Sequence, residues 1–267
     1  MKRIVIPTDF SENSIHAIDF AVHKLGDDDC KFTIVHVYQI PQGGQSGLFY
    51  LLEEMHKQAT SDMEELMEKL SSRYSNKKPA IESKVLQGDL ADQTNALAKE
   101  HKADCVVMGT KGATGLKEVL IGSNAVKLMS SLKLPMYAVP AEHEYKAINE
   151  VLVAYDGQEP FEDSCKPIST FAKRHHLPIT FFHVMTKDGK AVDNWDKIQE
   201  LFSDLHTELV EIEADEFEEG LEQITDDREA LLVLIRHKKS FWERLFNISD
   251  SRKALMHAKL PVLVIPE

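Results

Sequence analysis

Residues 106–124 read VVMGTKGATGLKEVLIGSN. An apolar run typical of a buried strand leads into a loop with Gly109 and Gly112, and Gly122-Ser123 opens the next helical stretch. Glycine lets backbone N–H groups approach an anion because no Cβ stands in the way. A helix start adds further N–H groups and the positive end of the helix dipole. The stretch therefore predicts a phosphate-binding loop at the carboxyl end of a parallel strand, where α/β folds bind ligands.

The sequence on either side alternates between two periodicities. Apolar runs typical of buried strands occupy residues 4–7, 32–38, 81–86, 105–108 and 136–139. Amphipathic helical stretches occupy residues 11–25, 51–74, 89–101 and 123–131. Strand and helix in alternation predict a parallel sheet that is covered by helices on both faces.

The second half of the chain repeats this order. Residues 151–156 (VLVAYD) match residues 4–9 (IVIPTD) at a shift of 147, and 180–184 (TFFHV) match 33–37 (TIVHV) at the same shift. From residues 105–108 onward the shift becomes 126. We therefore expect an α/β fold of two tandem, doubly wound, five-stranded parallel domains, residues 1–141 and 147–267.

Composition and charge exclude several classes of protein. At 267 residues, with 43% hydrophobic and 28% charged residues, the chain is globular and long enough for two domains. Its net charge of −13 argues against nucleic acid and anionic membranes as partners. Residues 1–140 carry 18 acidic and 16 basic side chains against 26 and 15 in the remainder, so an anion meets less repulsion in the first half. Three widely spaced cysteines favour a cytoplasmic protein over a disulfide or zinc framework.

The glycine spacing carries a resemblance to a known family. Gly109-x2-Gly112-x9-Gly122-Ser123 is similar to the nucleotide signature G-x2-G-x9-G-[ST] of the universal stress proteins. The opening IPTDFS at residues 6–11, His36-Val37 and Leu134-Pro135 resemble the same family. The resemblance implies an adenine-nucleotide hydrolase-like fold and a stress-response regulator that binds ATP or a related adenine nucleotide, which Mg²⁺ can accompany.

The resemblance also implies a set of ligand-binding residues in the first domain. Asp9 and Val37 would meet the base and the ribose, whereas the glycines, Ser123 and Asn124 would hold the phosphates. The complete implied set is Pro7, Thr8, Asp9, Val37, Gly88, Met108, Gly109, Thr110, Gly112, Gly122, Ser123 and Asn124. Simpler interpretations remain open here: Asp9 could cap the following helix, Gly88 could form a plain turn, and the glycine loop could only turn the chain.

The second copy departs from the motif. At the shift of 126, Gly109, Gly112 and Gly122 become Ile235, Lys238 and Ile248, and Asp250 replaces Asn124. Side chains at these positions would obstruct a phosphate. We expect the second domain to keep the fold without a nucleotide. The basic run 236–239 could hold an anion, but a solvated loop is the favoured interpretation.

No set of residues in the sequence assembles a catalytic centre. His36 and His183 lie in apolar strands and are interpreted as core histidines, and Cys105 is expected to be buried and inert. We therefore expect a regulatory binding protein, not an enzyme. A nucleotide-independent interaction scaffold is the alternative, and slow ATP hydrolysis is a weaker third.

The apolar terminal strands suggest how the domains assemble. Residues 136–139 and 262–265 each end their domain and are predicted to be edge strands. By family resemblance, such strands meet across a two-fold axis, which implies an internal pseudo-dimer within one chain. A homodimer on top of it and an unidentified protein partner are both compatible with this arrangement.

Overall fold

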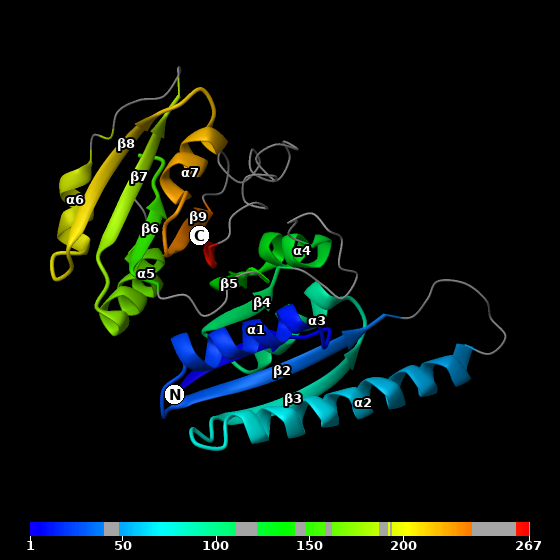
Figure 1. Ribbon diagram of the computed structural model, residues 1–267. Coiled ribbons are helices and arrows are strands. Elements are labelled where there is room, and N and C mark those ends of the chain that lie inside the picture. The colour runs from blue at the N-terminus through cyan, green and yellow to red at the C-terminus, as the bar shows by residue number, and fades with distance from the viewer. Residues whose placement is uncertain are drawn as a thin grey trace. The chain divides into compact units, whose positions relative to one another are not determined.

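The computed structural model describes residues 1–39, 48–110, 122–141, 148–157, 162–186, 192, 194–236 and 260–266. The chain forms two compact units (Figure 1): the described residues up to 141 build the first, and those from 148 onward build the second. Each unit is an α/β domain with five parallel strands. The predicted fold class of two doubly wound parallel domains is confirmed.

The first unit has the strand order β3-β2-β1-β4-β5. Its strands are β1 (Lys2–Pro7), β2 (Cys30–Tyr38), β3 (Ala80–Gln87), β4 (Cys105–Gly109) and β5 (Met136–Val139). Its helices are α1 (Glu12–Phe20), α2 (Leu48–Arg73), α3 (Leu90–Glu100) and α4 (Ser123–Ser131). The first predicted helix is only partly α-helical, because α1 continues as one turn of π-helix over Ala21–Leu25.

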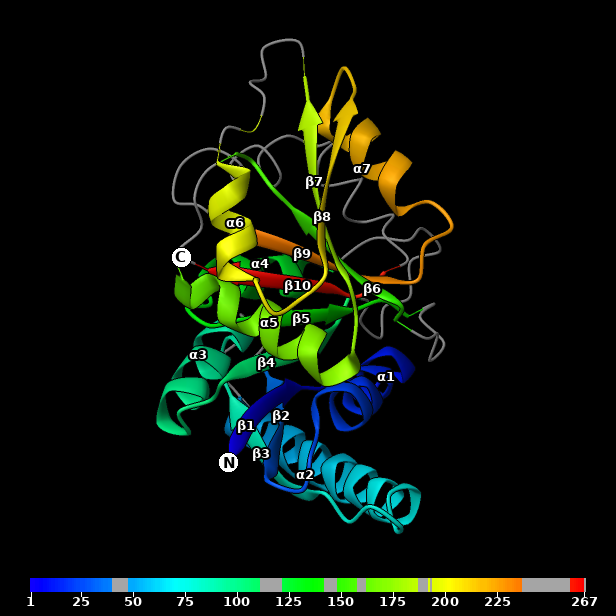
Figure 2. The same ribbon diagram turned by 90° about the vertical axis from the view of Figure 1, so that its left-hand side faces the viewer.

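Both faces of the first sheet are covered by helices. In Figure 2, α1 and α2 lie on one side of the strands and α3 on the other. The central strands are correspondingly apolar and closed to solvent, with Ile4, Ile6, Ile34 and Val106 at most 1% exposed. Burial on both faces explains why these strands read as continuous apolar runs in the sequence.

The second unit has the matching order β10-β9-β6-β7-β8. Its strands are β6 (Glu150–Ala154), β7 (Ile179–Met185), β8 (Thr207–Glu213), β9 (Ala230–Arg236) and β10 (Val262–Pro266). Its helices are α5 (Glu162–His175), α6 (Trp195–Leu201) and α7 (Phe217–Thr225), with α6 and α7 on opposite sides of β7 in Figure 1. Within their own units, β5 and β10 are the outermost strands, as predicted for the apolar runs that end each domain. The pseudo-dimer stays a prediction.

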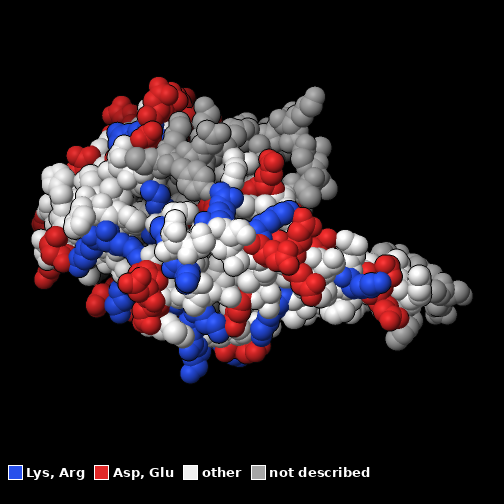
Figure 3. Space-filling model, turned by 60° about the horizontal axis from the view of Figure 1, so that its bottom comes forward, with Lys and Arg blue, Asp and Glu red and all other residues white. Residues whose placement is uncertain are grey.

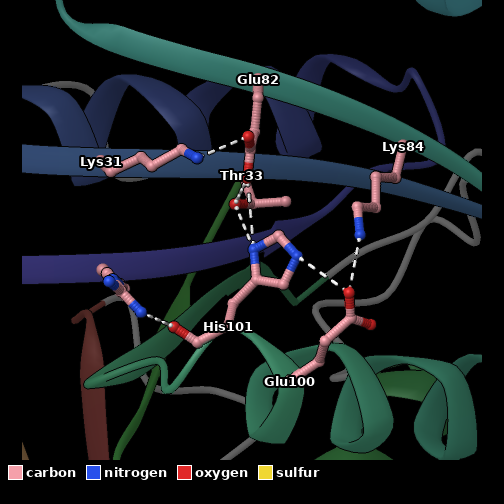
Figure 4. Close-up of polar contacts among 7 residues, drawn as sticks. Lys31, Thr33, Glu82, Lys84, Glu100 and His101 are labelled. Carbon is pink, nitrogen blue, oxygen red and sulfur yellow. Dashed lines mark hydrogen bonds and ion pairs between the residues drawn. The ribbon is translucent and has the colours of Figure 1, made fainter.

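A polar network fixes β2, β3 and the end of α3 in the first unit (Figure 4). Glu82 accepts a hydrogen bond from the Thr33 hydroxyl at 2.8 Å and pairs with the Lys31 ammonium at 2.6 Å. The Nδ1 atom of His101, which follows α3, lies 3.2 Å from the same carboxylate. The network lies toward the amino ends of the strands, away from the edge where the ligand site is predicted.

Candidate functional site

The strand order defines where a ligand site is expected. The chain runs outward from β1 through β2 to β3, and then returns to place β4 on the other side of β1. Ile4 pairs with Cys105 and Val5 with Val106, and continuing this register brings Thr8 level with Gly109. The ends of β1 and β4 therefore meet at the point where the strand order reverses, which is the usual ligand crevice of open α/β sheets.

Hydrogen bonds fix the turn after β1. Thr8 is 5% exposed, and its hydroxyl lies 2.8 Å from that of Ser14 and accepts the Phe10 N–H at 3.0 Å. Ser11 is the N-cap of α1. Asp9 is therefore not the helix cap; its exposed carboxylate accepts bonds from the Ser11 N–H at 3.2 Å and the Ser11 hydroxyl at 2.5 Å. The turn presents the Asp9 side chain at the carboxyl edge of the sheet.

His36 connects the ends of β1 and β2. Its Nδ1 atom lies 2.8 Å from the Thr8 carbonyl oxygen, and because a carbonyl only accepts, Nδ1 carries the proton. The Phe10 ring lies over the imidazole with a centroid separation of 4.4 Å. The interpretation of His36 as a satisfied structural histidine is confirmed. Val37, the next residue, is half-buried and pairs with Leu86 of β3.

Gly88 and Asp89 connect β3 to α3 at the same edge. Gly88 has φ +139°, which favours glycine, and donates its N–H to the Tyr38 carbonyl at 3.0 Å. Asp89 is the N-cap of α3, accepting the N–H groups of the second and third residues that follow it. Its other oxygen binds the Lys127 ammonium of α4 at 2.6 Å. These hydrogen bonds, foremost the one from Lys127, hold the pKa of the Asp89 carboxyl below its usual value.

Gly109 is required by packing, in addition to the predicted reason for this glycine, which stays a prediction. A Cβ at Gly109 would lie 2.6 Å from Asn13 Oδ1 and 2.9 Å from the Asn13 carbonyl oxygen. Asn13 cannot easily move, because its side-chain amide donates to the Val139 carbonyl at 3.1 Å. Thr110 likewise gives its N–H to Val139 at 3.0 Å, so this N–H already has an acceptor. Met108, just before Gly109, is half-buried.

Gly122 closes the base of the loop. Its N–H donates to the Thr110 carbonyl at 2.6 Å, which brings the two ends of the glycine-rich segment together. Gly122 is the N-cap of α4, and a Cβ added there would meet the Thr110 oxygen at an ordinary 3.4 Å. Ser123 and Asn124 are exposed, and the first turn of α4 carries no acidic residue. Gly112, like the rest of 111–121, lies outside the described residues.

The corresponding edge of the second unit has different chemistry. Tyr155 replaces Thr8 and is 6% exposed, with its hydroxyl donating to Asn194 Oδ1 and its ring edge-on to Phe181 at 6.2 Å. Ile235 occupies the position of Gly109 and is 6% exposed. His183 repeats the histidine contact, with Nδ1 2.8 Å from the Tyr155 carbonyl oxygen. The described residues do not include positions 237–250, where the predicted differences Lys238, Ile248 and Asp250 lie, nor the side chain of Arg236.

Other predicted features can be placed as well. Cys105 is buried, and desolvation raises the pKa of its thiol to about 12, so it is inert as predicted. Across the described ranges, no group of three or more His, Cys, Asp and Glu side chains could hold a metal ion. None of the described helices is both long and apolar enough to cross a membrane. Basic and acidic side chains are interspersed over the face in Figure 3.

Comparisons with known proteins cover both the sequence and the fold. The family model of the universal stress protein family matches residues 1–140. Universal stress protein MJ0531 of Methanocaldococcus jannaschii is 30% identical over 141 residues, 52% of this chain and 81% of that protein. Universal stress protein YxiE of Bacillus subtilis is 24% identical over 144 residues, 51% and 97% of the two chains. The crystal structure of a universal stress protein from Archaeoglobus fulgidus superposes with a TM-score of 0.74 at 17% identity, covering 99% of this chain and 96% of that one.

Proposed function

This chain belongs to the universal stress protein family, and we propose that its first unit binds an adenine nucleotide as a regulatory ligand. ATP or a related adenine nucleotide, with or without Mg²⁺, is the ligand favoured by the glycine motif together with the family resemblance. Binding would change the surface around residues 110–122, and a partner protein would read that change.

The observation that carries the proposal is the hydrogen bond that closes the loop. The Gly122 N–H donates to the Thr110 carbonyl at 2.6 Å, so the motif positions at 109 and 122 lie together although twelve residues separate them. They lie at the reversal point of the sheet, beside the end of β1 with Thr8 and Asp9. The two ends of the segment therefore lie at the edge where open α/β sheets bind ligands.

The start of α4 has the chemistry of a phosphate site. The first N–H groups of a helix have no partner within the helix, and the helix dipole favours negative charge there. Ser123 adds an exposed hydroxyl, and Gly122 leaves the approach free of a side chain. Support for the base end comes from the resemblance, which assigns Asp9 and Val37 to the base and ribose.

We propose binding without turnover. A phosphate cradle positions a nucleotide, whereas hydrolysis also needs a placed metal ion, an oriented water and its base. His36, the histidine nearest to the end of β1, already directs its Nδ1 proton to the Thr8 carbonyl. The neighbouring Asp9 carboxylate accepts two bonds from Ser11.

Isothermal titration of the full chain with ATP, AMP and cyclic AMP tests the proposal. We expect saturable binding of at least one of them, and Gly122→Val should abolish it because a side chain would enter the phosphate site. The thermal midpoint of Gly122→Val should fall by only a few degrees, because an added Cβ makes ordinary contact and the poorer N-cap costs about 1 kcal/mol. Failure of all three nucleotides to bind at millimolar concentration would overturn the proposal.

A matched control separates a local effect from a general one. Ser130→Ala lies in the last turn of the same helix, at the end remote from Gly122, and should bind nucleotide as the wild type does. If Gly122→Val and Ser130→Ala bind equally well, the loop does not hold the phosphates. A partner response that persists in Gly122→Val would favour the nucleotide-independent scaffold instead.

A further inference from the structure

Phe10 adopts a backbone conformation that its side chain disfavours. Its φ is +64°, in the left-handed region where a Cβ crowds the backbone and glycine is preferred. The residue follows Asp9 directly, at the carboxyl edge of the first unit. Non-glycine residues held in such conformations cluster at functional sites.

The second unit shows that the fold does not require this phenylalanine. At the shift of 147 the matching residue is Gly157, with φ +81° and, among the described residues, no heavy atom within 4 Å of an added Cβ. The neighbouring histidine contact is the same in both units, because His36 and His183 each approach a carbonyl oxygen at 2.8 Å. The turn and the histidine contact therefore form with glycine in place of phenylalanine.

The ring in the first unit is held in a defined position. It lies over His36 with a centroid separation of 4.4 Å and a tilt of 30°, and the imidazole is itself anchored to the Thr8 carbonyl. Phe10 is half-buried, so the residue is in part accessible to solvent. An anchored aromatic ring on an accessible residue is the kind of group on which a nucleobase stacks.

We infer that Phe10 is a base-binding residue of the first unit, whose ring, supported by His36, stacks on the purine of the nucleotide. This inference rests on the proposed function and adds a residue for the base end to the phosphate site at Gly122. The strain at Phe10 is then the cost of holding an aromatic ring at this turn. In the second unit, which lacks the glycine motif, the matching position is Gly157. Because stacking involves the base alone, Phe10 should contribute to the binding of ATP and not to the binding of inorganic triphosphate.

The test compares four proteins with two ligands. Isothermal titration with ATP and with inorganic triphosphate is applied to the wild type, Phe10→Gly, Phe10→Leu and Phe10→Tyr. Phe10→Gly and Phe10→Leu should weaken ATP binding by about tenfold or more, since both remove the aromatic face. Phe10→Tyr should bind ATP within about threefold of the wild type because it keeps that face. All four proteins should bind triphosphate equally.

Each outcome decides between the two proposals. If the wild type binds ATP and Phe10→Gly binds it as tightly, the inference is wrong and the proposed function stands. If Phe10→Gly loses affinity for ATP and for triphosphate to the same extent, the residue affects the site as a whole and the inference is again wrong. A wild type that binds neither ligand overturns both. Nuclear Overhauser effects between the adenine protons and the Phe10 ring give a second measurement, and their absence in the ATP complex would contradict stacking.

Discussion

The two units have the same framework contacts but different edges. In both, a histidine on the second strand places Nδ1 2.8 Å from a carbonyl oxygen at the end of the first strand. In both, a threonine of that second strand donates to a glutamate of the adjacent strand at 2.8 Å, Thr33 to Glu82 and Thr180 to Glu208. These contacts hold the sheet together, since they recur where the glycine motif is missing.

The two units differ at the carboxyl ends of the strands, where the ligand site is predicted. Thr8 becomes the buried Tyr155, Phe10 becomes Gly157, and Gly109 becomes Ile235. The comparison thus separates residues that make the fold from residues that would serve a ligand. It assigns His36 to the framework, whereas the Gly122 region at the same edge remains the proposed ligand site.

The largest expected effect of this difference is on nucleotide stoichiometry. We expect one nucleotide per chain, because losing several charge-assisted hydrogen bonds should weaken the second site by roughly 100-fold or more. Isothermal titration measures the stoichiometry directly. If the wild type binds two equivalents, the second unit also has a nucleotide site and the comparison fails.

The next effect concerns stability and separates the two motif glycines. Gly109→Val should destabilise the protein by about 3 kcal/mol or more, because it overpacks Asn13 and strands a buried hydrogen-bonding group. Gly122→Val should cost only about 1 kcal/mol, because an added Cβ makes ordinary contact and valine is a poorer N-cap than glycine. Urea unfolding followed by circular dichroism measures both values. Both tryptophans, Trp195 and Trp242, belong to the second half of the chain, so their fluorescence serves as an internal control.

Equal effects of the two substitutions would contradict this assignment. If both glycines could be replaced without loss of stability, the contact between Gly109 and Asn13 would not determine the packing of α1 on β4. If both destabilised the protein equally, Gly122 would also be a framework residue, and loss of binding in Gly122→Val would not identify a ligand site.

Much of the fold could be predicted because its determinants are local and repeated. Alternating apolar runs and amphipathic stretches identified every strand and helix of the first unit, and the shifts of 147 and 126 extended the topology to the second. The glycine spacing predicted a loop at the carboxyl end of a parallel strand, and Gly109 does end β4. Element ends were less accurate, as with the π-helical turn after Phe20.

The contacts that explain individual site residues could not be predicted. Gly109 has to be glycine because of Asn13, 96 positions earlier in the chain, and only the folded structure brings the two together. The helix cap was ambiguous because Asp9 and Ser11 are both good capping residues, and Ser11 takes that role. The strained turn at Phe10 did leave a signal, since the sequence repeat aligns it with Gly157.

A matched pair of substitutions tests the framework role of the histidines. His36→Phe and His183→Phe keep a ring but remove the donor, leaving a strand-end carbonyl without its bond. We expect each to lower the free energy of unfolding by about 1–2 kcal/mol, with the larger loss at His183, which is only 7% exposed. Chemical denaturation gives both values. If His36→Phe left stability intact and removed only nucleotide binding, His36 would be a ligand residue and the shared contact incidental.

The smallest expected effect lies in the polar network around Glu82. Partial burial favours the neutral carboxyl, but hydrogen bonds from Lys31 and Thr33 outweigh it and place the pKa of Glu82 below its usual value. The ionised form therefore stabilises the folded state above the unfolded pKa of about 4.3, and this contribution disappears as the pH falls through the lower folded-state value. Because the carboxylate is one third exposed, Glu82→Gln should cost only about 0.5 kcal/mol at pH 7.

Urea unfolding of the wild type and of Glu82→Gln at pH 7, 5 and 3 should show this difference shrinking toward the acid end. If the difference grew on acidification, the neutral form of Glu82 would be the stabilising one. The network would then differ from the framework contact between Thr180 and Glu208 in the second unit.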